Sequence, residues 1–202
     1  MTKKVQGRTY TSNHVKLLKH LDKLKKIQDK KPPSPVMVHI SIINACNLTC
    51  SFCCCANRPI KDRLPKEKVM QALDSFHRIG VKGLEFTGGG EPTLHPDFIE
   101  IVKYAHSLGF KMGLVTNGAM IGQKRKIKKE VIELFTWVRL GMYGFYEGYE
   151  YDLSVYEGTD VTVSAAYVWD EALETSKNPN ITGKWVDKIA RRLSRRFQCW
   201  TG

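Results

Sequence analysis

Two patterns of apolar residues alternate along the chain, one typical of strands and one typical of helices. The stretch 36–43, VMVHISII, is rich in β-branched residues and is typical of a buried strand. In the stretch 66–79, apolar residues recur at helical spacing, at Val69, Leu73 and Phe76. The same alternation continues along the chain. It predicts further strands at 83–87, 111–116, 137–142 and 161–169, and further helices at 96–108, 128–135 and 182–197.

Strands that alternate with crossover helices form a mainly parallel sheet wound in the right-handed sense. The sequence therefore predicts an α/β fold, a mainly parallel partial (β/α) barrel of five to six units. Five units are visible, and a sixth is not evident. Because an unpaired strand edge is usually covered in natural proteins, we expect a homodimer or a partner subunit to cover the open edge of the barrel.

The N-terminal segment carries a different pattern. Ser12 or Asn13 can cap a helix whose apolar stripe runs from Leu17 to Ile27 and is surrounded by lysines. Pro32 and the prolines after it end that helix. We predict a basic amphipathic helix with a proline-rich connector over 1–35 and the barrel over 36–202. The helix either packs across the barrel's lower end or binds a nucleic acid or membrane surface.

The composition of the chain indicates which class of protein it is and where in the cell we expect it. Hydrophobic residues make up 42% of the 202 positions and charged residues 26%, as in soluble globular proteins. Neither a spanning apolar run nor a secretory signal is present, so we predict a cytoplasmic protein without a membrane span. The formal net charge of +12 is compatible with a polyanionic partner and equally with a solvated basic surface.

Five of the six cysteines lie between positions 46 and 55. In the reducing cytoplasm such crowding indicates a metal centre rather than disulfides. Cys46, Cys50 and Cys53, spaced CxxxCxxC directly after the first predicted strand, can bind three irons of a cubane cluster and leave the fourth iron open. Ligands of parallel α/β folds bind beyond the carboxyl ends of the strands. A zinc site that also uses Cys54 or Cys55 is the alternative.

The octapeptide CNLTCSFC, residues 46–53, resembles the signature of radical S-adenosylmethionine (SAM) enzymes, with Phe52 in the aromatic position. The resemblance implies a [4Fe–4S] cluster on Cys46, Cys50 and Cys53, with SAM chelated by the open iron. In that family the reduced cluster passes one electron to SAM. The products are methionine and a 5′-deoxyadenosyl radical, which abstracts a hydrogen atom from the substrate.

Three further segments resemble the SAM-binding motifs of the same family. Residues 87–92, TGGGEP, resemble its GGE motif, which implies that the backbone of Gly88, Gly89 and Gly90 and the side chain of Glu91 receive the amino group of SAM. Thr116 and Asn117 resemble its TNG strand ending. By the same resemblance, Arg139 approaches the SAM carboxylate. Ordinary glycine or Asn-Gly turns are the alternative for both loop motifs.

The combined motifs predict a radical SAM enzyme whose substrate is unidentified, with a peptide or an RNA among the candidates. We expect a flavodoxin- or ferredoxin-like electron donor. The residues supply no candidate for the substrate half of the reaction; His95 is expected to position a helix start, and the acidic, aromatic segment 143–158 either walls a pocket or packs locally. The alternative function is a non-catalytic or degenerate iron–sulfur or zinc protein that binds nucleic acid through basic surfaces.

Overall fold

The computed structural model describes residues 19–147 and 149–166. These residues fall into two compact units, which separate between Pro35 and Val36. In the first unit, the described helix is α2 (Leu21–Gln28). The Lys23 ammonium donates hydrogen bonds to the backbone oxygen of Ser34 at 3.0 Å and to its hydroxyl at 2.6 Å. These bonds join α2 to the proline-rich connector that follows it.

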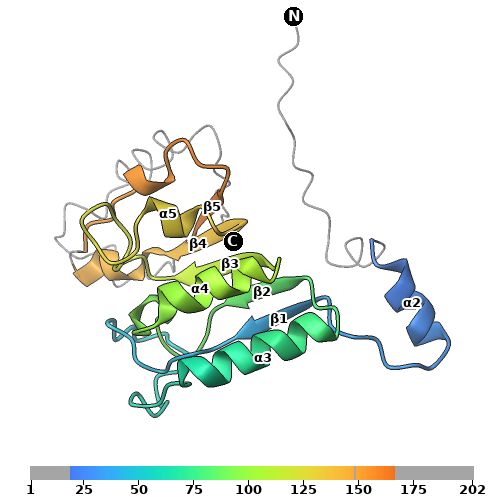
Figure 1. Ribbon diagram of the computed structural model, residues 1–202. Helices are drawn as coiled ribbons and strands as arrows, with labels where there is room; N and C mark the ends of the chain where they lie inside the picture. Colours follow the sequence, from blue (N-terminus) through green and yellow to red (C-terminus); the bar gives the residue numbers. More distant parts are fainter. Residues whose placement is uncertain (1–18, 148, 167–202) are drawn as a thin grey trace, which may run out of the picture. The chain divides into compact units, whose positions relative to one another are not determined.

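The second unit is built on one sheet of five parallel strands in sequential order (Figure 1). The strands are β1 (Met37–Ile40), β2 (Gly83–Phe86), β3 (Lys111–Thr116), β4 (Trp137–Gly141) and β5 (Thr162–Ala166). All five predicted strands are present, and β5 is described as far as Ala166. The predicted helix 182–197 and Cys199 lie outside the described residues. The predicted α/β class with a parallel sheet is confirmed.

The crossovers between strands become progressively less helical along the chain. Two full helices, α3 (Lys66–Arg78) and α4 (Phe98–Ser107), make the first two crossovers and lie side by side in Figure 1. The third contains only the single turn α5 (Lys129–Ile132), shorter than the predicted helix 128–135. The fourth contains two 3₁₀ helices, η2 (Met142–Glu147) and η3 (Ser154–Tyr156). Another short 3₁₀ helix, η1 (Pro92–Leu94), precedes α4.

The core lies between the sheet and its helices. Alternate strand residues face the helices and are fully buried, such as Phe86 on β2, Leu114 on β3 and Val138 on β4. The Phe86 ring packs against the rings of Phe98 and Phe135, with centroids 5.9 and 6.2 Å away. The intervening residues point to the opposite face. Within the described residues, no helix is long and apolar enough to cross a membrane.

Candidate functional site

The cysteine loop, residues 44–58, leaves the carboxyl end of β1 and leads towards α3. The side chains of Cys46, Cys50 and Cys53 are of intermediate exposure, and none of the three is in a disulfide. Two turns shape the loop, because the amide of Cys53 donates to the Cys50 carbonyl and that of Ala56 donates to the Cys53 carbonyl, both at 3.1 Å. All three predicted cluster ligands therefore lie on one short loop at the edge where the parallel strands end.

The glycine–glutamate segment, residues 87–91, runs beside the chain that leads into this loop. Its backbone amides continue the hydrogen-bonding of β1 and β2 beyond the ends of the strands. The amide of Thr87 donates to the Ile40 carbonyl at 3.1 Å, that of Gly90 to the Ile43 carbonyl at 3.0 Å, and that of Glu91 to the Ala45 carbonyl at 2.8 Å. Residues 41–43, predicted as strand, are outside the regular strand β1. This irregular ladder holds them on one side, and an isolated antiparallel bridge between Ile43 and Arg63 holds them on the other.

Two glycines of the segment are required by close backbone approach. Gly88 has a φ of +144°, and a Cβ there would overlap Ser41. A Cβ at Gly90 would overlap the backbone of Asn44 and the carbonyl oxygen of Ala45. The amide of Gly89 donates to the Ser41 hydroxyl at 2.9 Å. These contacts bring the glycine–glutamate segment against the residues immediately before Cys46.

The carboxylate of Glu91 is directed into the protein, with only 3% of the residue exposed. It accepts hydrogen bonds from the amide of Thr93 (3.1 Å), the hydroxyls of Thr93 (2.5 Å) and Thr116 (2.7 Å), and the amide of Asn117 (2.7 Å). Burial raises the pKa of Glu91, and these hydrogen bonds oppose the rise. Glu91 thus joins the end of β2 to the end of β3.

Asn117 connects the end of β3 with the first cysteine. Its side-chain amide donates to the Asn47 side-chain oxygen at 2.8 Å and to the sulfur of Cys46 at 3.8 Å. Its side-chain oxygen accepts the amide of Ala119 at 3.0 Å. The side chains of Thr116 and Asn117, both predicted from the resemblance to contact SAM, make these hydrogen bonds within the protein.

Arg58 was missed by the sequence analysis. Its Nε donates to the carbonyl of Asn44 at 2.5 Å, and its Nη1 donates to the carbonyl of Cys55 at 2.6 Å and to the sulfur of Cys53 at 3.6 Å. The signal in the sequence is a single arginine five residues beyond the last motif cysteine. The exposed Cys54 and its neighbour Cys55 have sulfurs 3.7 Å apart, and this contact raises the pKa of Cys55.

An aromatic pair lies beside the second cysteine. Phe52, in the motif's aromatic position, contacts the ring of Tyr143 edge-on, with the centroids 5.0 Å apart. Burial and the nearby Cys50 raise the pKa of Tyr143, and Arg139 lowers it. Arg139 pairs in register with Val115 of β3 and Ser164 of β5, and its side chain is on the face of the sheet opposite the helices. Phe52 and Arg139 are thus both near Tyr143.

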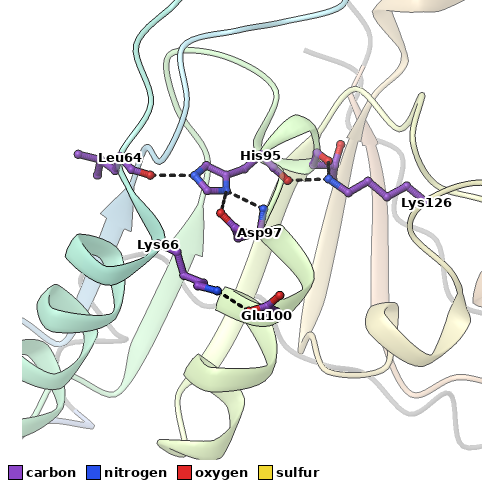
Figure 2. Close-up of polar contacts among 7 residues, drawn as sticks. Leu64, Lys66, His95, Asp97, Glu100 and Lys126 are labelled. Carbon is purple, nitrogen blue, oxygen red and sulfur yellow. Dashed lines mark hydrogen bonds and ion pairs between the residues drawn. The ribbon is translucent and has the colours of Figure 1, made fainter.

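His95 lies between η1 and α4 and is 1% exposed (Figure 2). Its Nδ1 accepts the amide of Asp97 at 3.1 Å, so its Nε2 carries the proton and donates to the Leu64 carbonyl at 2.8 Å. Asp97 is the residue before α4. The Lys126 ammonium donates to the carbonyls of Thr93 (3.1 Å) and His95 (2.6 Å). His95 and Lys126 therefore fix the chain around η1 and the start of α4.

The donor set of the cysteine loop fits an iron–sulfur cluster. Cluster irons are held by cysteine thiolates, and N–H groups near the sulfurs are a usual part of such sites. The loop provides three thiols, with an N–H donor at the sulfurs of Cys46 and Cys53. Within the described residues, no three His, Cys, Asp or Glu side chains are grouped so as to hold a single metal ion. A cubane instead distributes its cysteine ligands over separate irons.

A parallel partial barrel with a three-cysteine loop at the carboxyl end of its first strand defines the class of protein. The family model "Radical SAM superfamily" matches residues 40–150, more than half of the chain. The chain therefore belongs to the radical SAM superfamily. Members of this superfamily bind a [4Fe–4S] cluster and SAM, so the predicted family and its cofactors are confirmed.

Curated relatives match this chain over about half its length. An S-adenosylmethionine-dependent nucleotide dehydratase of Selenomonas ruminantium is 31% identical over 98 residues, 48% of this chain and 35% of the relative. A GTP 3′,8-cyclase of Limosilactobacillus fermentum is 31% identical over 113 residues, 53% of this chain and 34% of the relative. A PqqA peptide cyclase of Bradyrhizobium diazoefficiens is 32% identical over 96 residues, 45% and 24%. All three are enzymes, and the matches cover about a quarter to a third of each.

Solved structures share the fold. SuiB of Streptococcus suis bound to S-adenosylmethionine has a TM-score of 0.50 and 16% identity, and the match covers 98% of this chain and 58% of that one. SuiB bound to its precursor peptide SuiA has a TM-score of 0.51 and 15% identity, with coverages of 94% and 54%. At these identities the likeness extends to the fold alone.

Proposed function

We propose that this chain is a radical SAM enzyme in which Cys46, Cys50 and Cys53 bind the [4Fe–4S] cluster. The observation that carries the proposal is the set of three backbone hydrogen bonds that joins the glycine–glutamate segment to residues 40–45, the chain directly before Cys46. When bound, the cluster supplies one electron that cleaves SAM to methionine and a 5′-deoxyadenosyl radical, which abstracts hydrogen from a substrate.

Six of the eight predicted SAM-binding residues divide into two groups in this proposal. The guanidinium of Arg139 faces the cofactor, because a guanidinium complements a carboxylate. The backbone carbonyls of Gly88, Gly89 and Gly90 face its amino group, since the amides of Gly89 and Gly90 already donate to Ser41 and Ile43. Glu91 and Asn117 instead hold the loops at the ends of β2 and β3 in place, since their side-chain oxygens already accept hydrogen bonds from the protein.

A peptide is the substrate class that we propose. Acidic residues follow β4 at Glu150, Asp152 and Glu157 and disfavour a phosphate-rich ligand there. The basic run 124–129 gives little support to an RNA, because Arg125, Lys126 and Lys129 donate to backbone carbonyls of the protein. A flavodoxin- or ferredoxin-like donor supplies the electron, and a second copy or a partner subunit covers the open sheet edge. We place the enzyme in the cytoplasm.

The proposal is tested with anaerobically reconstituted protein, SAM and dithionite. We expect about four irons per chain and equal amounts of 5′-deoxyadenosine and methionine. Cys50→Ala should lose the cluster and both products, whereas Cys54→Ala, which changes an exposed cysteine outside the motif, should keep them. Stoichiometric zinc on the loop, without 5′-deoxyadenosine, would overturn the proposal in favour of the nucleic-acid-binding alternative.

A further inference from the structure

The guanidinium of Arg58 is fixed inside the cysteine loop. Its bonds to the carbonyls of Asn44 (2.5 Å) and Cys55 (2.6 Å) hold it from two sides, and its Nη1 is 3.6 Å from the sulfur of Cys53. The position of a Cβ at Gly89 would be 3.6 Å from Cδ of Arg58. Arg58 therefore passes beside the glycine–glutamate segment and ends at a proposed cluster ligand.

The N–H donors that contact the sulfurs of Cys46 and Cys53 differ in charge. The contact to Cys46 comes from the neutral side-chain amide of Asn117, at 3.8 Å. The contact to Cys53 comes from the guanidinium of Arg58, which is a cation. A cluster that gains an electron gains one negative charge, so a fixed cation beside it stabilises the reduced form more than the oxidised form.

We propose that Arg58 is a positioning residue that raises the reduction potential of the cluster and holds Cys53 in place. This inference rests on the proposed function of the cysteine loop. The step it assists is the reduction of [4Fe–4S]²⁺ to [4Fe–4S]⁺ by one electron from a low-potential one-electron donor. Asn117 makes the corresponding contact at Cys46, but its side-chain amide is neutral.

The test is an EPR-monitored redox titration of the reconstituted cluster in the full chain, without SAM, together with iron content. Arg58→Gln removes the charge, and we expect the ratio of reduced to oxidised cluster at a fixed potential to fall about tenfold, a shift of about 59 mV to more negative potential. Arg58→Lys keeps the charge but loses the planar fork, so a smaller shift in the same direction is expected.

Lys61→Gln is the matched control. It removes the same charge from an exposed side chain three residues away and should leave the potential unchanged. A fully loaded Arg58→Gln protein with the wild-type potential would overturn the inference. If that variant takes up no iron, Arg58→Lys decides, and a potential at or above that of the wild type would overturn it.

The inference and the proposed function fail separately. A wild-type cluster that is reduced normally but yields no 5′-deoxyadenosine would sink the enzyme proposal and leave the role of Arg58 measurable. If the wild type cleaves SAM and Arg58→Gln leaves the potential of the cluster unchanged, the role of Arg58 is overturned and the enzyme proposal stands.

Discussion

Gly90 shows how strongly one residue affects the packing of the loops at the carboxyl ends of the strands. A methyl group there would overlap the carbonyl oxygen of Ala45, one residue before Cys46. We predict that Gly90→Ala displaces the cysteine loop, lowers the free energy of unfolding by about 1–3 kcal/mol and reduces the iron bound per chain. Urea unfolding and iron analysis of the reconstituted protein measure the two effects.

Gly80→Ala provides the comparison. Gly80 has a φ of +81°, with open space around the position of a Cβ, so its substitution costs about 1–2 kcal/mol of backbone strain. Because Gly80 follows α3 and not the cysteine loop, iron binding should stay at the wild-type level. Equal iron loss in both variants would mean that general destabilisation, and not the contact with Ala45, releases the cluster.

The buried carboxylate of Glu91 makes stability depend on pH. Burial raises its pKa above the ordinary value of 4.5, so the folded chain binds this proton more tightly than the unfolded chain. The resulting contribution to the free energy of unfolding is complete below pH 4.5 and is lost as pH rises through the folded-state pKa. Glu91→Gln does not titrate. The stability of the wild type relative to this variant should therefore fall from pH 4.5 upwards.

Urea unfolding of both chains at intervals between pH 4 and pH 8 measures this difference. A difference that increases with pH would mean that the four hydrogen bonds to Glu91 outweigh burial and hold its pKa below the ordinary value. The side chain of Tyr156 belongs to the same buried region, because burial and then the nearby charge of Glu91 raise the pKa of Tyr156.

At the scale of elements, the start of α4 depends on His95, which links it to the chain before α3 (Figure 2). His95→Phe leaves the Leu64 carbonyl and the Asp97 amide without these partners. We predict a loss of about 1–3 kcal/mol in the free energy of unfolding, measured by urea denaturation. His106→Phe changes an exposed histidine of the same helix and should stay within about 0.5 kcal/mol of the wild type. Equal losses in both variants would contradict the assigned role of His95.

The local pattern of apolar residues predicted the strands and helices well wherever that pattern was regular. The alternation of β-branched, strand-like segments with helix-like segments located all five strands and the helices α3 and α4. The first strand was predicted too long because residues 41–43 are as β-branched as β1 itself, although they contact a glycine segment and an isolated bridge residue instead of a regular strand. The third crossover helix is one turn, a length that tertiary packing decides more than propensity does.

The candidate site was predictable where spacing along the chain carries the chemistry. The spacing of Cys46, Cys50 and Cys53 and their position after the first strand placed them on one loop at the ends of the strands, where the structure has them; their role as cluster ligands stays a prediction. The direction of the Glu91 side chain was not, because it depends on Thr116, 25 residues later. Arg58 was missed because its contacts with Asn44 and Cys53 exist only once the loop has turned back on itself.

At the scale of the whole molecule, the described residues that the proposed function requires lie in the second unit. We predict that a chain truncated to residues 36–202 binds as much iron and releases as much 5′-deoxyadenosine as the full chain. Iron analysis and product quantification on both proteins provide the measurement. A truncated chain that folds but binds no iron would show that residues 1–35 take part in forming the site.

The ladder that joins residues 40–45 to residues 87–91 has a consequence for protein engineering. A cysteine loop transplanted alone into another barrel would lose the amides that align it, and an insertion of one residue between Thr87 and Glu91 would put every later pair out of step. The two motifs are separated in sequence by a whole helix, yet they form a single module that has to be grafted, and inherited, as a pair.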